Sequence, residues 1–365
     1  MDYNNLSDPP LTSENPEHAI NEEPVRHDFF FQWHITERCN LRCIHCYQEE
    51  TDNKELSFIE IKDVIGEIRE TLRAWEENYK IGFSPGFNIT GGEPFLRRDF
   101  FQILEEIRKD GADIYILSNG TMIDKERAEA LSRLGVKGVQ ISVEGPLEIH
   151  DRIRGEGSFT KAMRGTGNLL DAGMTVTLNA TLSDLNGPYI HELVSLAAGA
   201  GVQNLGFSRL VPCGRGGTLL NEMMDAQKVK KLYLSLSSVQ VKGLNIVTGD
   251  PIASQMNLKG ASDTGCTAYG GCAAGVSGLT IRPDGTINPC RRLDIPIGNI
   301  MEDSLREVWA TSEVLNLLRD KSKYKGKCGA CCRWANCRGC RAIAYACSMA
   351  KGEADFLSED PQCFL

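Results

Sequence analysis

The chain has 365 residues, of which 41% are hydrophobic and 24% charged, a composition typical of a soluble globular protein of about two domains. No apolar run approaches the ~20 residues that a membrane span needs. We expect no signal peptide, because the first residues offer neither a basic segment nor an apolar one. The net charge of −9 argues against non-specific binding to nucleic acid or to an anionic membrane. We therefore expect a cytoplasmic protein with neither kind of partner.

The 14 cysteines form two clusters, three between residues 39 and 46 and ten from residue 266 onward, with Cys213 alone between them. Disulfides are typical of small secreted chains, whereas cysteines at short fixed spacings in a reducing cytosol usually bind metal. Because the chain carries no export signal, we expect both clusters to bind metal. Cys213 is expected to be a buried free thiol.

Short apolar strands alternate with amphipathic helices through much of the chain. The expected strands are 29–35, 87–90, 113–118, 136–143, 175–181 and 204–210, and the expected helices are 57–77, 99–110, 124–134, 158–172 and 189–200. Such alternation predicts a parallel sheet with right-handed crossovers. The expected fold class is α/β, a partial TIM-like (β/α)6 barrel followed by a small cysteine-rich domain.

The domain boundaries follow from shifts in composition. Residues 1–28 are polar and predict a disordered or loosely docked arm, and residues 29–221 contain the barrel pattern. Residues 222–263 read as a linker with a helix and a short strand at 244–247. Residues 264–365 are rich in Gly, Cys and Arg but poor in apolar runs, so metal clusters would supply the missing stability.

The distinctive motifs of the barrel region fall where predicted strands end. They are the cysteine loop and the segments Gly91-Gly92-Glu93-Pro94, 118–121 and 142–145. Because the carboxyl ends of parallel strands meet at one edge of a sheet, these motifs predict a single site there.

Cys39, Cys43 and Cys46 follow a Cys-x3-Cys-x2-Cys spacing. Three thiolates would leave one iron of a [4Fe–4S] cluster open to a ligand. A zinc site is the alternative, with His34 or His45 as the fourth ligand that structural zinc usually requires. The spacing alone leaves both interpretations open.

The run from Thr36 to Tyr47, including the aromatic residue after the last cysteine, resembles the signature of the radical S-adenosylmethionine (SAM) superfamily. This resemblance implies that Cys39, Cys43 and Cys46 hold a [4Fe–4S] cluster whose open iron chelates the methionine part of SAM. One electron would then release a 5′-deoxyadenosyl radical, chemistry that belongs to the cofactor.

The other strand-end motifs resemble the cofactor contacts of the same family. The Gly-Gly-Glu-Pro segment looks like its methionine-binding motif, in which Glu93 accepts from the ammonium group and the glycines allow close approach of the backbone. A strand-end hydroxyl for Ser142 and a surface charge for Arg154 are the plain alternatives to binding. The resemblance implies SAM-binding positions at Tyr47, Gly91, Gly92, Glu93, Ser118, Asn119, Ser142, Arg154, Asn179 and Leu210.

The C-terminal cysteines resemble the SPASM domain, which holds two auxiliary [4Fe–4S] clusters; a pair of zinc knuckles is the alternative. The spacing departs from the family at Cys337-x2-Cys340, which is one residue short, and Cys332 and Cys347 compete as ligands. The resemblance implies one set at Cys266, Cys272, Cys290 and Cys340, and a second at Cys328, Cys331, Cys337 and Cys363.

The resemblance leaves the substrate open. Our first hypothesis is a peptide or protein, modified by a thioether or carbon–carbon crosslink. Many such relatives carry a leader-binding module, and we expect a separate leader-peptide-binding protein or direct binding because there is no room before Phe29. Flavodoxin or ferredoxin is the expected reductant. Sulfatase maturation is disfavoured because Arg291 stands where that family has an acidic base.

The alternative substrate is a tetrapyrrole, modified or decarboxylated at a side chain. Segments 337–342 and 360–363 resemble the radical decarboxylases of alternative haem synthesis. Bidentate contacts to propionates, or to acidic peptide residues, are open to Arg291, Arg292, Arg338 and Arg341. A non-catalytic electron carrier is disfavoured because it would not need the methionine-binding motifs.

Overall fold

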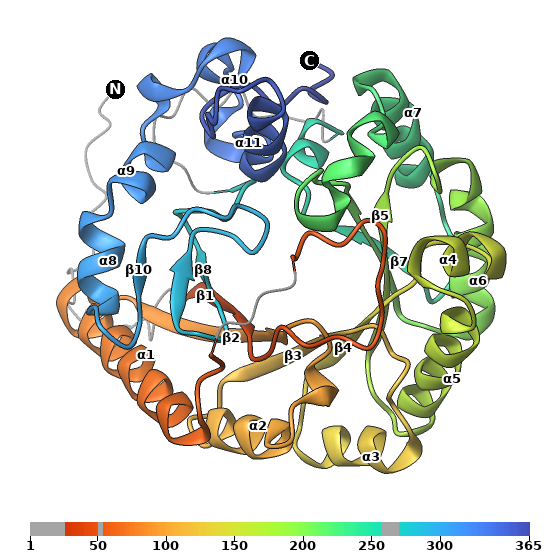
Figure 1. The fold of residues 1–365 in the computed structure, drawn as a ribbon, viewed down its shortest axis with the longest axis horizontal. Coiled ribbons are helices and arrows are strands. Elements are labelled where there is room, and N and C mark those ends of the chain that lie inside the picture. The colour runs from red at the N-terminus through yellow and green to blue at the C-terminus, as the bar shows by residue number, and fades with distance from the viewer. Residues whose placement is uncertain (1–25, 50–53, 257–269) are drawn as a thin grey trace, which may run out of the picture.

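The computed structural model describes residues 26–49, 54–256 and 270–365. In these residues, one ten-stranded sheet has the order β10-β9-β8-β1-β2-β3-β4-β5-β6-β7. Neighbouring strands from β8 through β1 to β7 are parallel, and β9 and β10 add an antiparallel extension. Figure 1 shows the parallel strands curving inside a ring of helices, as the α/β partial barrel predicts.

The strands are β1 (Arg26–His34), β2 (Gly82–Thr90), β3 (Asp113–Ser118), β4 (Gly138–Ser142), β5 (Val176–Leu182), β6 (Asn204–Arg209), β7 (Asn245–Thr248), β8 (Gly278–Ile281), β9 (Thr286–Asn288) and β10 (Gly298–Asn299). The α-helices are α1 (Phe58–Tyr79), α2 (Phe100–Arg108), α3 (Lys125–Arg133), α4 (Leu147–Arg154), α5 (Ser158–Asp171), α6 (Ile190–Ala200), α7 (Ala226–Ser237), α8 (Leu305–Thr311), α9 (Glu313–Arg319), α10 (Gly326–Ala330) and α11 (Arg341–Met349).

The sheet is wider than the six predicted βα units, because β7 pairs with β6 and β8 pairs with β1. The pairing of Phe30 with Gly278 joins segments far apart in the sequence, so no local pattern announces it. A Cβ atom at Gly278 would lie 2.6 Å from the carbonyl oxygen of Phe30. This close approach requires glycine at the seam.

The side chains of β1 alternate between two environments, as the two-residue period of a strand dictates. Phe29 packs against Trp75 of α1 and Trp309 of α8, and Trp33 is fully buried in the same apolar core. Gln32 and His34 face the other side, where they contact polar groups. The interior of the barrel is therefore polar at this end, which is where the predicted site lies.

The first helix begins with a capping box. The Ser57 hydroxyl accepts from the backbone N–H of Glu60 at 3.3 Å, and the Glu60 carboxylate accepts from the backbone N–H of Ser57 at 2.6 Å. These contacts satisfy amide groups that a helix start leaves unpaired.

A buried ion cluster links the barrel to the C-terminal region. Arg209, at the end of β6, is 1% exposed and pairs with Asp250 at 2.6 Å and with Asp360 at 2.8 Å. Asp360 also accepts from the backbone N–H of Cys340 at 2.8 Å. The chain end is thus tied to the barrel by charge as well as by packing.

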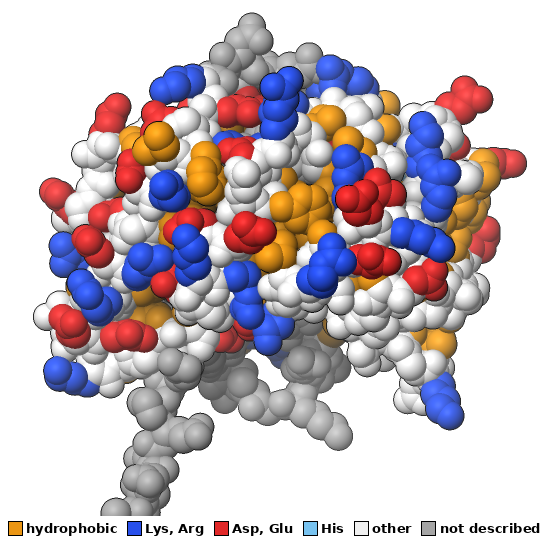
Figure 2. Space-filling model, turned by 90° about the horizontal axis from the view of Figure 1, so that it is seen from below, with side chains coloured by type: hydrophobic (Ala, Val, Ile, Leu, Met, Phe, Trp, Pro, Cys, Tyr) orange, Lys and Arg blue, Asp and Glu red, His pale blue; other side chains and the backbone are white. Residues whose placement is uncertain are grey.

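No helix in the described part of the chain is long and apolar enough to cross a membrane. The face in Figure 2 intersperses basic and acidic side chains around a small apolar area, so neither sign of charge dominates it.

Candidate active site and cluster-binding residues

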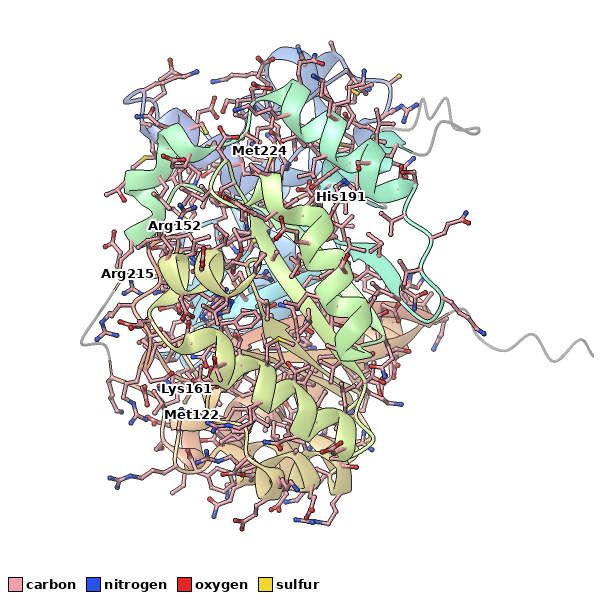
Figure 3. All side chains as sticks on the ribbon, turned by 90° about the vertical axis from the view of Figure 1, so that its right-hand side faces the viewer. Met122, Arg152, Lys161, His191, Arg215 and Met224 are labelled. Atoms are coloured by element: carbon pink, nitrogen blue, oxygen red, sulfur yellow. The ribbon has the colours of Figure 1, made fainter. Side chains whose placement is uncertain are left out.

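A cavity of about 150 Å³ lies at the carboxyl ends of the barrel strands. Figure 3 shows Met122, Arg152 and Arg215, which follow β3, β4 and β6, on the same side of the molecule. Most of the predicted cofactor positions line this one cavity: Cys39, Cys43, Cys46, Tyr47, Gly91, Gly92, Ser118, Asn119, Ser142, Arg154 and Asn179.

The loop after β1 carries three free thiols into this cavity, with Cys43 buried and the other two partly buried. Burial raises the pKa of Cys39 and of Cys43. The Leu41 backbone N–H lies 3.5 Å from the sulfur of Cys39, and Nη1 of Arg154 lies 3.7 Å from that of Cys43. These donors favour the thiolate form, which is the form that binds metal.

Gly91 and Gly92 are required by the contact between two loops. A Cβ atom at either position would overlap a backbone carbonyl oxygen of the segment 36–38. Gly92 N–H donates to the Thr36 carbonyl at 2.9 Å, and Glu93 N–H donates to that of Arg38 at 2.8 Å. The sequence predicted that these glycines allow the backbone to come close to a ligand. In the structure they allow it to come close to the start of the cysteine loop.

Glu93 and Leu210 lie behind the cavity wall. Glu93 is fully buried and accepts from the Ser118 hydroxyl and the Asn119 backbone N–H, each at 2.8 Å. Burial raises the pKa of Glu93 to about 7. Leu210 is 1% exposed. The structure gives Glu93 a role in fixing the end of β3, and its predicted contact with the ammonium group stays a prediction.

Arg154 is held in place by Glu144, a residue to which the sequence assigned no role. The Glu144 carboxylate accepts from Arg154 at 2.6 Å, from Nε2 of His45 at 3.0 Å and from the Thr181 backbone N–H at 2.8 Å. Although burial acts against it, the charge of Arg154 keeps the pKa of Glu144 well below its usual range. Arg154 is therefore an oriented cation at the cysteine loop rather than a surface charge.

Asn119 connects β3 to the same loop. Its amide donates to Oδ1 of Asn40 at 2.9 Å and lies 4.0 Å from the sulfur of Cys39. On the other side of the loop, Gly214 and Gly216 of the 3-10 segment Gly214–Glu222 pack against its backbone. The sequence offered no signal for this second contact beyond a run of glycines.

A second cavity, of about 440 Å³, shares Tyr47, Arg291 and Arg292 with the first. His34, at the end of β1, lines it as well. Nδ1 of His34 lies 3.0 Å from the Gln48 amide. Burial, and then the charges of Arg282 and Arg291, lower the pKa of His34 to about 3, so the imidazole is neutral.

Of the four arginines proposed as anion contacts, the structure brings only two together. Arg338 and Arg341 are 2% and 1% exposed and lie outside both of these cavities. Arg338 donates to the carbonyls of Cys272 and Ala335, and Arg341 to those of Phe356 and Ser358. Both guanidinium groups are thus held by backbone carbonyls away from these two cavities, and a substrate contact by Arg338 or Arg341 stays a prediction.

A third cavity, of about 360 Å³, lies in the C-terminal region. All four cysteines predicted to hold the second auxiliary cluster line it: Cys328, Cys331, Cys337 and Cys363. Cys332 also reaches this cavity but is exposed. Cys347 does not line it, and its sulfur lies 3.7 Å from that of Met223.

The structure describes three of the four cysteines predicted to hold the first auxiliary cluster, namely Cys272, Cys290 and Cys340. The fourth, Cys266, lies outside the described residues. Cys290 and Cys340 belong to one apolar cluster. Burial raises the pKa of Cys340 to about 12, and the charge of Cys272 adds to the shift. Three members of the set thus lie close together. Cys213 is a free thiol, partly buried, whose pKa burial raises to about 12.

The thiols are spread around the two cysteine-lined cavities. Across residues 26–49, 54–256 and 270–365, no group of three or more His, Cys, Asp or Glu side chains is placed to hold one metal ion. Thiols spread around a cavity instead match a cubane, whose irons each take a separate cysteine. The residues present therefore fit iron–sulfur clusters.

The comparisons with known proteins agree with this site. Residues 33–197 match the radical SAM superfamily, and residues 272–340 match the SPASM family, an iron–sulfur cluster-binding domain. The chain therefore belongs to the radical SAM superfamily of enzymes. Within it, the chain is a radical SAM protein with a C-terminal SPASM domain.

Two curated relatives match most of the chain. The AdoMet-dependent heme synthase of Methanosarcina barkeri is 31% identical over 347 residues, 91% of this chain and 95% of the relative. The mycofactocin maturase MftC of Mycolicibacterium smegmatis is 32% identical over 324 residues, 86% of this chain and 78% of the relative.

Solved structures share the fold at lower identity. Streptococcus suis SuiB bound to S-adenosylmethionine superposes with a TM-score of 0.69 at 19% identity, covering 93% of this chain and 78% of SuiB. Native anSMEcpe with bound AdoMet gives a TM-score of 0.68 at 19% identity, covering 92% and 93%.

Proposed function

We propose that this enzyme uses SAM to remove a hydrogen atom from a substrate that carries carboxylates, and that the substrate is a tetrapyrrole with propionate side chains. Cys39, Cys43 and Cys46 are the residues that would hold the SAM-binding cluster. The two C-terminal cysteine sets would hold two more. A reduced cluster with SAM bound supplies the 5′-deoxyadenosyl radical that takes the hydrogen atom.

The observation that carries this proposal is the pair of arginines between the two barrel cavities. Nη1 of Arg291 donates to Gln32 at 3.1 Å, and Nη1 of Arg292 donates to the Arg209 carbonyl at 3.1 Å. Among the described residues neither forms an ion pair, and Nε of Arg292 is buried without a hydrogen-bond partner.

Electrostatics favours an anion at this pair. Burial, and then the adjacent charge of Arg292, lower the pKa of Arg291. The pKa of Arg292 is raised, because the charges of Cys340 and Cys290 outweigh its burial. A carboxylate placed between the two arginines would remove their repulsion and would accept the strong, geometrically specific hydrogen bonds that guanidinium groups form. The same cavity is lined by two neutral groups, the imidazole of His34 and the phenol of Tyr47, and by the charged side chains of Glu49, Arg282 and Asp294.

The choice of a tetrapyrrole rests on the relatives. The sequence alone favoured a peptide, but the heme synthase of Methanosarcina barkeri matches over nearly the whole length of both proteins. Decarboxylation of a propionate would transfer one hydrogen atom to the radical, release carbon dioxide, leave a vinyl group and pass one electron to an iron–sulfur acceptor. A peptide is the second candidate, supported by the similarity to a mycofactocin maturase.

The test uses the reconstituted, dithionite-reduced enzyme with SAM and iron coproporphyrin deuterated at the propionate carbon next to the ring. We expect deuterium in 5′-deoxyadenosine and release of carbon dioxide. Formation of 5′-deoxyadenosine without deuterium, with the porphyrin unchanged, would contradict the tetrapyrrole proposal and favour a peptide.

Arg291→Met should raise the KM for the porphyrin roughly 10- to 100-fold, because a hydrogen bond to a charged group contributes about 1.5–3 kcal/mol. SAM cleavage without substrate should persist. Arg152→Met is the matched control, since Arg152 is exposed and lines neither cavity. An equal effect of both variants would exclude a specific anion contact at Arg291.

A further inference from the structure

The four-cysteine cavity of the C-terminal region contains a buried amide from another part of the chain. Gln255 belongs to the 3-10 segment Pro251–Met256, which follows β7, and it is 4% exposed. Its Nε2 lies 3.7 Å from the sulfur of Cys337 and 3.6 Å from that of Cys363. One amide group therefore reaches two of the four thiols.

The orientation of this amide follows from its surroundings. Oε1 of Gln255 is buried and has no hydrogen-bond partner among the described residues. Turning the amide over would direct that oxygen at two sulfur atoms, which are acceptors when they ligate a metal, and would remove both donor contacts. The NH2 group facing Cys337 and Cys363 is the favourable arrangement.

Gln255 completes a set of donors around the cavity. The Arg333 backbone N–H lies 3.3 Å from the sulfur of Cys331, and Nη2 of Arg341 lies 3.5 Å from that of Cys328. The Gly339 backbone N–H lies 3.4 Å from the sulfur of Cys337. Within the described residues, the Gln255 amide is the donor that reaches the sulfur of Cys363.

We propose that Gln255 is a positioning residue that raises the reduction potential of the iron–sulfur cluster held by Cys328, Cys331, Cys337 and Cys363. N–H groups directed at cluster sulfurs stabilise the more negative, reduced state, and such hydrogen bonds are among the factors that set cluster potentials. Removing the Gln255 amide leaves Cys363 without this donor and Cys337 with fewer. The proposal does not depend on which substrate the enzyme uses.

The test is an EPR-monitored redox titration of the full-length, reconstituted enzyme. Gln255→Met keeps the length of the side chain but removes the donor. We expect the midpoint potential of one cluster to become more negative while the potentials of the others, the iron content and the sulfide content stay unchanged. Gln362→Met is the matched control, because Gln362 is 3% exposed and adjoins Cys363. Its side chain accepts from Arg209 and donates to the Met224 carbonyl, and in the described part of the chain it has no contact with a cluster thiol.

An intact cluster with an unchanged potential in Gln255→Met would overturn the proposal, as would an equal shift in Gln362→Met. If Gln255→Met does not retain the cluster, a measurement on the unmodified protein tests the proposal instead. With glutamine side-chain amides labelled with 15N, pulsed EPR should detect coupling of one amide nitrogen to a reduced C-terminal cluster. Absence of that coupling would overturn the proposal as well.

Discussion

The barrel site and the C-terminal cavity hold their thiols in different ways. Three cysteines of the barrel site lie within one short loop, residues 39–46, braced by strand ends. The four of the C-terminal cavity are spread over residues 328–363 and share their cavity with Gln255. The barrel cavity is also lined by cations and polar side chains that a cofactor can contact. In the C-terminal cavity, each of the four thiols predicted as cluster ligands already has a protein donor.

The difference separates two tasks. A site that must bind and cleave a small molecule needs open coordination and polar groups aimed at the ligand. A site that only exchanges electrons needs four ligands and a fixed hydrogen-bond environment. The following predictions test this division, from the largest expected effect to the smallest.

Replacing Cys39, Cys43 and Cys46 together by alanine should abolish SAM cleavage, because no other described cysteine lines the cavity of about 150 Å³ at the strand ends. Iron should fall by about four atoms per chain while the C-terminal clusters remain. The assay is 5′-deoxyadenosine formation with dithionite, measured beside iron content. Residual cleavage at the wild-type rate would place the reactive cluster elsewhere.

Replacing Cys328 and Cys331 by alanine should have the complementary effect. The variant should lose about four irons per chain and melt at a lower temperature, because cluster binding contributes folding free energy to this region. It should still cleave SAM but should not complete substrate turnover. Cys332→Ala is the matched control and should keep its iron, since Cys332 is exposed. If Cys332→Ala lost iron while the double variant kept it, Cys332 would be a cluster ligand and the assignment of Cys328 and Cys331 would be wrong.

Two buried ion networks, Glu144 with Arg154 and Arg209 with Asp250 and Asp360, should differ in how much the loss of one carboxylate lowers the free energy of unfolding. Glu144→Gln leaves Arg154 without its carboxylate partner and should lower the free energy of unfolding by about 3–5 kcal/mol. Asp360→Asn leaves Arg209 paired with Asp250, so about 1–3 kcal/mol is expected. Urea unfolding at pH 7 measures both. A larger loss in Asp360→Asn would reverse the ranking of the two networks.

His34 should make the barrel site sensitive to acid. Its pKa is lowered to about 3 by burial and then by Arg282 and Arg291, so the unfolded chain binds a proton below about pH 6.5 that the folded chain excludes. Stability should therefore fall as the pH drops from 6.5 toward 3, by about 2 kcal/mol at pH 5.

His34→Gln should lack this component of the acid sensitivity. Urea unfolding at pH 7 and pH 5 compares the two proteins, with the exposed His191 (Figure 3) replaced by glutamine as the control that follows the wild type. An identical loss of stability in His34→Gln and wild type would contradict the assignment.

The sequence alone was sufficient to predict the features that depend on short segments of the chain. The spacing of Cys39, Cys43 and Cys46 and the strand-end position of Gly91-Gly92 located the barrel site, because both features lie within short segments and parallel strands bring them together. The alternation of strands and helices gave the fold class for the same reason.

The sequence alone did not predict the long-range contacts. Three contacts join residues separated in the sequence: the pairing of β8 with β1, the ion pair between Glu144 and Arg154, and the hydrogen bond from Gln255 to Cys363. A glutamate or glutamine has many uses, and its partner is decided only by the folded backbone.

The central claim is that this chain carries iron–sulfur clusters and cleaves SAM at the barrel loop. The most direct measurement is metal analysis of the anaerobically reconstituted, unmodified protein, followed by dithionite, SAM and quantification of 5′-deoxyadenosine. We expect about twelve irons per chain from three cubane clusters and 5′-deoxyadenosine as the product. Bound zinc with little iron and no 5′-deoxyadenosine would contradict the claim.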